Sequence, residues 1–136
     1  LEIVKGVINE TRPDVVIAVD ALAARSTKRL NRTIQITDTG IIPGSGVGNH
    51  RNGLTKETLG VTVIGIGVPT VVDAATIVQD SMEKLLQTLE EKEKKEFLEE
   101  MIPPALSSMF VTPKDVDETM KRLSYTISEG LNRVFC

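Results

Sequence analysis

The sequence predicts an α/β fold in which a mixed sheet is flanked by helices and followed by a helical C-terminal part. Two apolar runs rich in β-branched residues, 15–19 and 61–68, are typical of strands buried on both faces of a parallel sheet. Residues 33–37 alternate polar and apolar side chains, which is typical of a half-exposed strand near a sheet edge. We expect a single domain, with a sheet-containing region at 1–78 and a helical cover at 79–136.

The first part of the chain contains a helix, a strand and a second helix in the predicted order. Apolar residues at helical spacing predict a helix over residues 1–12 that is already under way at Leu1, so we expect the chain to be a piece of a longer one. The strand at 15–19 stops at Asp20, and residues 21–30 have a composition compatible with a helix. A basic cluster, interpreted as solvated surface or a subunit contact, comprises Arg25, Lys28, Arg29 and Arg32.

The second part of the chain is mostly helical. Pro69 ends the strand at 61–68, and apolar residues then recur at three- and four-residue steps, which predicts an amphipathic helix from residue 72 or 73 to about 89. A charged helix follows over 90–101. The final helix is predicted to have Thr112 as its N-cap and Pro113 at its first position, and to run to about residue 135.

Composition and charge argue against several classes of function. Sixteen Lys and Arg residues against nineteen Asp and Glu give a formal charge of −3, so we expect no direct binding to nucleic acid. A single cysteine, Cys136, excludes an internal disulfide and a cysteine-based metal site, and fits a reducing, cytoplasmic compartment. The longest uncharged run, 58–72, is short and rich in glycine, so we expect neither membrane insertion nor secretion.

Asp20 is the first candidate for chemistry. A carboxylate that directly follows a buried strand lies at the carboxyl end of that strand, where open α/β sheets form their ligand crevices. The alternative is that Asp20 caps the helix predicted to follow it. Asp73, at the entry to the long amphipathic helix, has the same two interpretations, a helix cap or part of a site.

A glycine-rich segment separates the two halves of the predicted sheet. Eight of the ten glycines lie between residues 40 and 67, where the backbone geometry is expected to be most specialised. The spacing of Gly44, Gly46 and Gly48 fits neither the dinucleotide fingerprint nor the phosphate loop. A loop that approaches a substrate chain or a partner subunit accounts for it better.

Two further polar residues are weaker candidates. Asp38 begins an Asp-Thr-Gly triplet that pepsin-like aspartic proteases also contain, but the match is three residues long, and a turn that ends the strand is the preferred interpretation. His50 is the only histidine and is interpreted as a surface loop residue. Since the spacing of potential ligands supplies no zinc site, we expect no metal and no cofactor. A metal-dependent peptidase that uses Asp20, Asp73 and His50 is the weakest alternative.

Longer blocks of sequence carry a more specific signal. They run in order with compatible spacing: DALAARS at residues 20–26, TIQITDTG at 33–40, PGSGVGN at 43–49 and GIGVPTVVDA at 65–74. The tail FVTPKDVD at 110–117 and the final helix fit the same pattern. Together these blocks closely resemble the family of bacterial spore germination proteases.

The resemblance implies an endopeptidase that degrades small acid-soluble spore proteins in the spore core when germination begins. It further implies a zymogen that processes itself, a homotetramer, and a fold similar to that of the hydrogenase maturation proteases. The family resembles an unusual aspartic peptidase with two catalytic Asp residues. One matches Asp20, and the other belongs to a turn expected upstream of Leu1. Asp73 and the loop with Gly44, Gly46 and Gly48 become candidate walls of the site, with Asp73 also a possible second acid.

The resemblance predicts that this chain alone does not cleave peptides. Two nearby carboxylates can share one proton, so that one accepts a proton from water while the other supports the developing oxyanion. A single carboxylate cannot divide these roles. The alternative function, from a different class, is a non-catalytic α/β module for binding or oligomerisation, in which Asp20 serves as a cap.

Overall fold

The computed structural model of the protein describes residues 1–47 and 52–136. These residues form two compact units, each made of two stretches of chain. The expected single domain with a division at residue 78 stays a prediction. The first unit comprises Leu1–Ala23 and Thr33–Pro69, and the second comprises Ala24–Arg32 and Thr70–Cys136.

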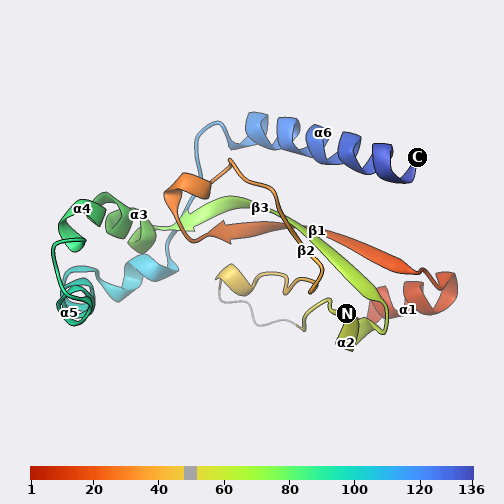
Figure 1. Cartoon of the computed structure of the whole chain (residues 1–136), viewed down its shortest axis with the longest axis horizontal. Helices are drawn as coiled ribbons and strands as arrows, with labels where there is room; N and C mark the ends of the chain where they lie inside the picture. The colour runs from red at the N-terminus through yellow and green to blue at the C-terminus, as the bar shows by residue number, and fades with distance from the viewer. Residues whose placement is uncertain (48–51) are drawn as a thin grey trace. The chain divides into compact units, whose positions relative to one another are not determined.

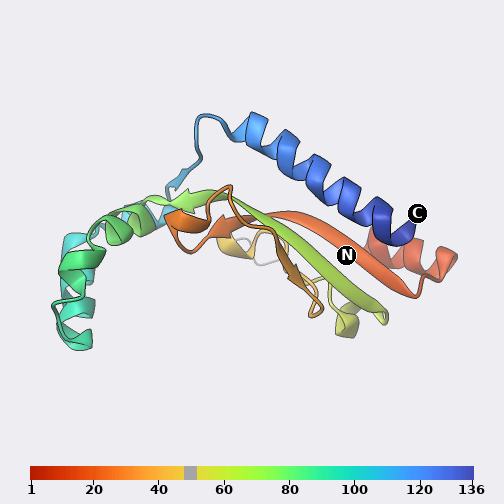
Figure 2. The same ribbon diagram turned by 45° about the horizontal axis from the view of Figure 1, so that its top comes forward.

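A four-stranded sheet is the framework of the fold. Its strands are β1 (Val15–Ala24), β2 (Gln35–Thr37), β3 (Thr62–Asp73) and β4 (Phe110–Val111). The order is β1-β3-β2, and β4 pairs with a different part of β3. Strands β1 and β3 point in the same direction in Figures 1 and 2, whereas β2 and β4 run antiparallel to β3. The predicted α/β class with a mixed sheet is therefore confirmed.

Strand β3 supplies the core of the first unit. Val63, Ile66 and Val68 on this strand are all buried. Strand β2 pairs with it in a register that runs from Gln35 opposite Gly67 to Thr37 opposite Gly65. The middle residue of β2, Ile36, is 71% exposed. The strand predicted over 33–37 is confirmed at Gln35–Thr37, but the alternation does not predict its buried side, because the apolar Ile36 is exposed.

Two helices belong to the first unit, and both have caps that the local sequence explains. Helix α1 ends where Arg12, in the left-handed conformation with φ 47°, donates its N–H to the carbonyl oxygen of Ile8. Helix α2 begins at a reciprocal cap between Thr55 and Thr58. The helix predicted over 1–12 is confirmed. The bounds are Glu2–Thr11 for α1 and Lys56–Leu59 for α2.

The helix predicted over residues 21–30 is wrong. Strand β1 continues through Asp20 to Ala24, and only one 3₁₀ turn, η1 (Thr27–Arg29), follows it. The side chain of Leu22 packs against Gly67 of β3, and this contact requires an extended backbone. Tertiary packing thus overrides the weak helical preference of an alanine-rich segment. The expected burial of this strand on both faces is also wrong for the described chain, since Val19 is 57% exposed.

The prediction that Pro69 ends its strand is wrong as well, because β3 continues to Asp73. Pro69 lies after Gly67, the last residue that pairs with β2, and before Val72, the first that pairs with β4. Its missing N–H therefore costs no hydrogen bond to either of these strands.

The second unit contains most of the helical residues. The helix predicted from 72 or 73 to 89 is interrupted at Met82. Just before this point, the hydroxyl of Ser81 donates a hydrogen bond to the carbonyl oxygen of Ile77 at 2.7 Å, a contact that often bends helices. The charged helix predicted over 90–101 is confirmed. The helices are α3 (Ala74–Ser81), α4 (Glu83–Leu86), α5 (Glu91–Met101), η3 (Pro104–Ser108) and α6 (Val116–Phe135).

A short segment before α6 is fixed to the end of β3. The N–H of Ala74 donates to the carbonyl oxygen of Met109 at 2.8 Å, and the hydroxyl of Thr112 donates to the carbonyl oxygen of Thr70 at 2.7 Å. Because Thr112 makes this contact, it is not the N-cap, and the predicted start of the last helix is wrong. Helix α6 begins at Val116 and ends at Phe135, and none of its residues is buried.

Candidate functional site

Asp20 lies in the middle of β1 and not at its carboxyl end. Its Oδ1 accepts a hydrogen bond from the N–H of Ala21 at 2.9 Å, and this bond is exposed to solvent. No helix begins at this point, so the helix-cap interpretation of Asp20 is wrong. The carboxylate is therefore accessible on a strand that stands at one end of the order β1-β3-β2.

The contact between Leu22 and Gly67 implies that Asp20 of β1 lies beside Gly65 of β3. A Cβ atom at Gly67 would meet the side chain of Leu22, so Leu22 and Gly67 lie next to each other on one face. Side chains alternate between the two faces of a sheet, and β1 and β3 are parallel, so Asp20 and Gly65, two residues earlier, are also neighbours on that face. Thr37 of β2 pairs with Gly65 from the other side. The three strands thus present Asp20, Gly65 and Thr37 in one row.

The base of the glycine-rich loop packs on the same row. Ile41 and Leu54 form an isolated antiparallel bridge, with N–H···O distances of 3.0 and 2.7 Å. A Cβ atom at Gly65 would collide with Cγ2 of Ile41, so Ile41 fills the space that Gly65 leaves free. Gly40 has φ +83°, and a Cβ there would collide with the carbonyl oxygen of Leu54. We call Gly40, Ile41 and Leu54 the neck, and it lies on the face that carries Asp20.

The loop beyond the neck is described in part. Gly44 adopts φ +76°, and its carbonyl oxygen accepts a hydrogen bond from the N–H of Val47 at 3.2 Å. Gly46 lies within a 3₁₀ turn, Ser45–Val47. Gly48 and His50 lie outside the described residues. The role of these glycines as a substrate or subunit loop stays a prediction.

Asp38 belongs to a turn, as predicted. The hydroxyls of Thr37 and Thr39 share a hydrogen bond at 2.7 Å, and the N–H of Thr39 donates to Oγ1 of Thr37 at 3.1 Å. These bonds enclose Asp38 at the end of β2, where its side chain is exposed.

Asp73 caps helix α3 in the second unit. Its Oδ1 accepts the N–H of Thr76 at 2.7 Å, and its Oδ2 accepts the hydroxyl of Thr76 at 2.8 Å. The cap interpretation of Asp73 is confirmed, and its role as a site wall or second acid stays a prediction. Phe110 of β4 lies opposite Asp73 in the strand register. Asp20 belongs to the first unit and Asp73 to the second.

Asp80 of α3 is the most strongly bonded carboxylate among the described residues. Its Oδ2 accepts the N–H and the hydroxyl of Thr27, both at 2.7 Å, and the hydroxyl of Ser26 at 3.1 Å. Partial burial raises the pKa of Asp80, but the bonds from Thr27 and Ser26 and the charge of Lys28 lower it more, so the net pKa lies below its ordinary value. No sequence pattern distinguishes Asp80 from other acidic residues, so sequence reasoning missed it.

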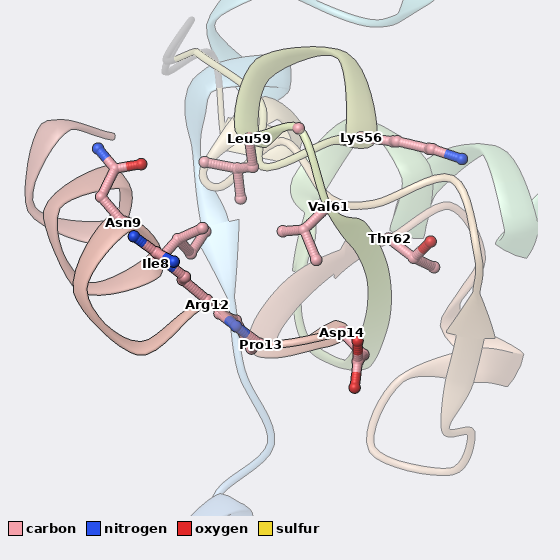
Figure 3. Close-up of a pocket in the computed structure, with 10 residues that line it drawn as sticks. Ile8, Asn9, Arg12, Pro13, Asp14, Lys56, Leu59, Val61 and Thr62 are labelled. Atoms are coloured by element: carbon pink, nitrogen blue, oxygen red, sulfur yellow. The ribbon is translucent and has the colours of Figure 1, made fainter.

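A separate groove of about 750 Å³ lies at the start of β1 and β3. Ile8, Leu59 and Val61 turn toward one another in it, and Lys56 points away (Figure 3). Asp14, which also lines the groove, precedes Asp20 by six residues, or about 20 Å along an extended strand. The groove is therefore distinct from the row that contains Asp20.

Among residues 1–47 and 52–136, no group of three or more His, Cys, Asp or Glu side chains could hold a metal ion. In the same residues, no helix has the length and apolar character needed to cross a membrane.

Comparison with known proteins defines the family. The germination protease family matches residues 1–88 of the chain. The germination proteases of Caldanaerobacter subterraneus and Clostridium tetani are 46% and 45% identical to it, each over 96% of the chain and 46% of the relative. The germination protease of Bacillus subtilis is 40% identical, over 96% of the chain and 48% of the relative.

These matches assign the chain to a peptidase family with the α/β architecture described above. The chain belongs to the germination protease family. It spans about half the length of the curated relatives it matches.

The catalytic role of Asp20 stays a prediction, and sequence reasoning missed the residues that surround it. The Gly-Ile-Gly sequence at 65–67 was a usable signal, because glycine inside an apolar strand often marks the close approach of other atoms. Which atoms approach was not readable, since Leu22 and Ile41 come from distant parts of the sequence.

Proposed function

We propose that the chain is part of a spore germination endopeptidase in which Asp20 is a catalytic carboxylate. The observation that carries the proposal is the position of Asp20, a half-buried residue of β1 whose carboxylate makes a solvent-exposed hydrogen bond and lies on the same face as Gly65 and the neck. Membership in the germination protease family supports peptide hydrolysis as the reaction. The similarity to hydrogenase maturation proteases is part of the same proposal.

The proposed chemistry needs a second carboxylate. One ionised carboxylate takes a proton from the attacking water, and a protonated partner stabilises the oxyanion that develops on the substrate carbonyl. Both oxygens of Asp73 already accept hydrogen bonds from Thr76, which favours a capping role for Asp73. We therefore assign the second acid to a residue outside this chain. The location of Asp20 on the end strand of the described order leaves room for another strand beside it.

The proposed substrates are small acid-soluble spore proteins, which the full-length protease would degrade in the spore core at germination. Self-processing of a zymogen and assembly as a homotetramer belong to the same proposal. Support for self-association comes from α6, which has no buried residue and carries the exposed apolar side chains of Val134 and Phe135. Light scattering of the full-length protein measures the assembly, and a monomer would contradict it.

The decisive experiment compares the full-length protein with its Asp20→Asn variant on a purified spore protein. We expect Asn at position 20 to abolish cleavage while the protein stays folded, because the amide keeps the size of the carboxylate but cannot accept the proton. Asp73→Asn serves as the matched control and is expected to retain cleavage. The proposal also predicts that this chain alone does not cleave. Efficient cleavage by the chain alone, or by the Asp20→Asn variant, contradicts it.

A further inference from the structure

Gly65, in the middle of the row that contains Asp20, has no side chain of its own. On one side stands Asp20 of β1, and on the other stands Thr37 of β2. A Cβ atom at Gly65 would lie 3.0 Å from Cγ2 of Thr37 and 3.3 Å from the carbonyl oxygen of Gly40, and it would collide with Cγ2 of Ile41. The side chain next to Asp20 across β3 is therefore that of Ile41.

Two independent constraints hold Ile41 in this place. Its backbone is fixed by the paired hydrogen bonds with Leu54, at 3.0 and 2.7 Å. Its side chain is fixed because Cγ2 fills the space above Gly65. Ile41 is only half-buried, so part of the residue is exposed to solvent.

The surface beside the carboxylate is apolar. Leu22 follows Asp20 by two residues on the same face and covers Gly67, and Ile41 covers Gly65. A peptide that presents a backbone carbonyl to Asp20 would thus place a neighbouring side chain against aliphatic groups. Such a surface selects by the size of an apolar side chain, because each methylene group in a hydrophobic pocket changes the discrimination by about tenfold or more.

We propose that Ile41 is a specificity-determining residue of the peptidase, against which an apolar side chain next to the scissile bond packs. The inference rests on the proposed function, in which Asp20 is catalytic. It adds a residue that contacts the substrate to the catalytic carboxylate.

The test measures kcat/KM of the full-length protein for two peptides that differ only in one residue beside the cleaved bond, leucine or alanine. We expect the preference for the leucine peptide to fall by about tenfold or more in Ile41→Ala, because three carbon atoms of the contact surface are removed. Ile41→Val, which removes one methyl group and preserves the fold, should reduce the preference in the same direction by a smaller factor.

A reciprocal pair of substitutions separates substrate contact from packing. Gly65→Ala should destabilise the protein because its methyl group collides with Ile41, and adding Ile41→Ala should restore stability by making room. If Ile41 touches the substrate, the double variant regains stability but not the leucine preference. If Ile41 only packs against Gly65, the double variant regains both, and the inference is overturned.

Gly60→Ala is the matched control, since its φ of +71° strains an alanine while no atom lies within 4 Å of the new Cβ, so neither Leu22 nor Ile41 is displaced. We expect it to lower stability and to leave the leucine preference of the remaining folded protein unchanged. An unchanged preference in both Ile41→Ala and Ile41→Val would overturn the inference while leaving the peptidase proposal intact. Absence of cleavage by the unsubstituted full-length protein would instead refute the proposed function.

Discussion

Thr27 donates two hydrogen bonds to one carboxylate oxygen of Asp80, from its backbone N–H and from its hydroxyl group, both at 2.7 Å. The two residues are 53 positions apart in the sequence. Together with the bond from Ser26, these contacts tie the turn η1 to helix α3 within the second unit. Because the bonds are partly buried and charge-assisted, they should contribute more than ordinary surface contacts.

Asp80→Asn should lower the free energy of unfolding by about 1–2 kcal/mol, since the amide keeps the size of the side chain but loses the charge that strengthens three hydrogen bonds. Thr27→Val, which removes one of the three donors, should cost about 1 kcal/mol. Urea unfolding of the chain measures both. Glu100→Gln, on the exposed surface of α5, is the control, and an equal effect there would contradict the assignment.

The pH dependence of stability should report on the same carboxylate. The pKa of Asp80 in the folded chain lies below its ordinary value of 3.8, so the ionised form favours the folded state. This contribution is fully present above about pH 4, and it is lost as the pH falls through the folded-state pKa. The difference in unfolding free energy between the unsubstituted chain and Asp80→Asn should therefore shrink on acidification from pH 5 to pH 2. A constant difference would refute the linkage.

Gly40→Ala should be much more damaging than Gly60→Ala. Both glycines have positive φ, +83° and +71°, so alanine pays a similar backbone strain of about 1–2 kcal/mol at either position. At Gly60 no atom lies within 4 Å of the new Cβ, whereas at Gly40 it collides with the backbone carbonyl oxygen of Leu54. We expect the additional cost at Gly40 to open the neck. Thermal unfolding of the two variants measures the difference, and equal melting temperatures would contradict the described neck.

Asp73→Ala should destabilise α3 by about 1 kcal/mol, the usual effect of removing an N-cap. Thr76→Val should cost less, because the backbone N–H of residue 76 still donates to Asp73 and only the hydroxyl bond is lost. Circular dichroism during urea unfolding measures both changes. An equal or larger loss in Thr76→Val would show that the hydroxyl, and not the cap, is the important contact.

Asp20→Asn should leave the stability of the chain nearly unchanged. The Oδ1 atom accepts a single exposed hydrogen bond from Ala21, and an asparagine side chain can accept the same bond. Unfolding in urea should give a difference below about 0.5 kcal/mol, as expected for a surface substitution. A large loss of stability would mean that any loss of cleavage in this variant has a structural cause.

Much of the fold could be predicted because the relevant signals are local. Periodicity at 1–12 and charge spacing at 90–101 identified α1 and α5, and the alternation at 33–37 identified the exposed strand β2. Boundaries that depend on distant contacts were not predictable. The extension of β1 to Ala24 depends on Leu22 packing against Gly67, and the late start of α6 depends on the bond from Thr112 to Thr70.

In the candidate site too, local features could be predicted from the sequence and contacts between distant residues could not. Asp20 was singled out because it follows the apolar run 15–19, although β1 continues past it to Ala24. Its surroundings could not, because Gly65 and Ile41 become its neighbours only through strand register and the bridge to Leu54. The capping role of Asp73 was readable from position alone, since Thr76 follows it by three residues, the spacing of a helix cap.

The contact between Leu22 and Gly67 has a consequence for how such sequences can diverge. A Cβ atom at position 67 would collide with the side chain of Leu22, so a larger residue there displaces the leucine from the volume it occupies. A larger residue at position 67 should therefore be found only in sequences that carry a smaller one at position 22. The two positions are 45 residues apart in the sequence, yet we expect their side-chain sizes to vary in a correlated way among related sequences.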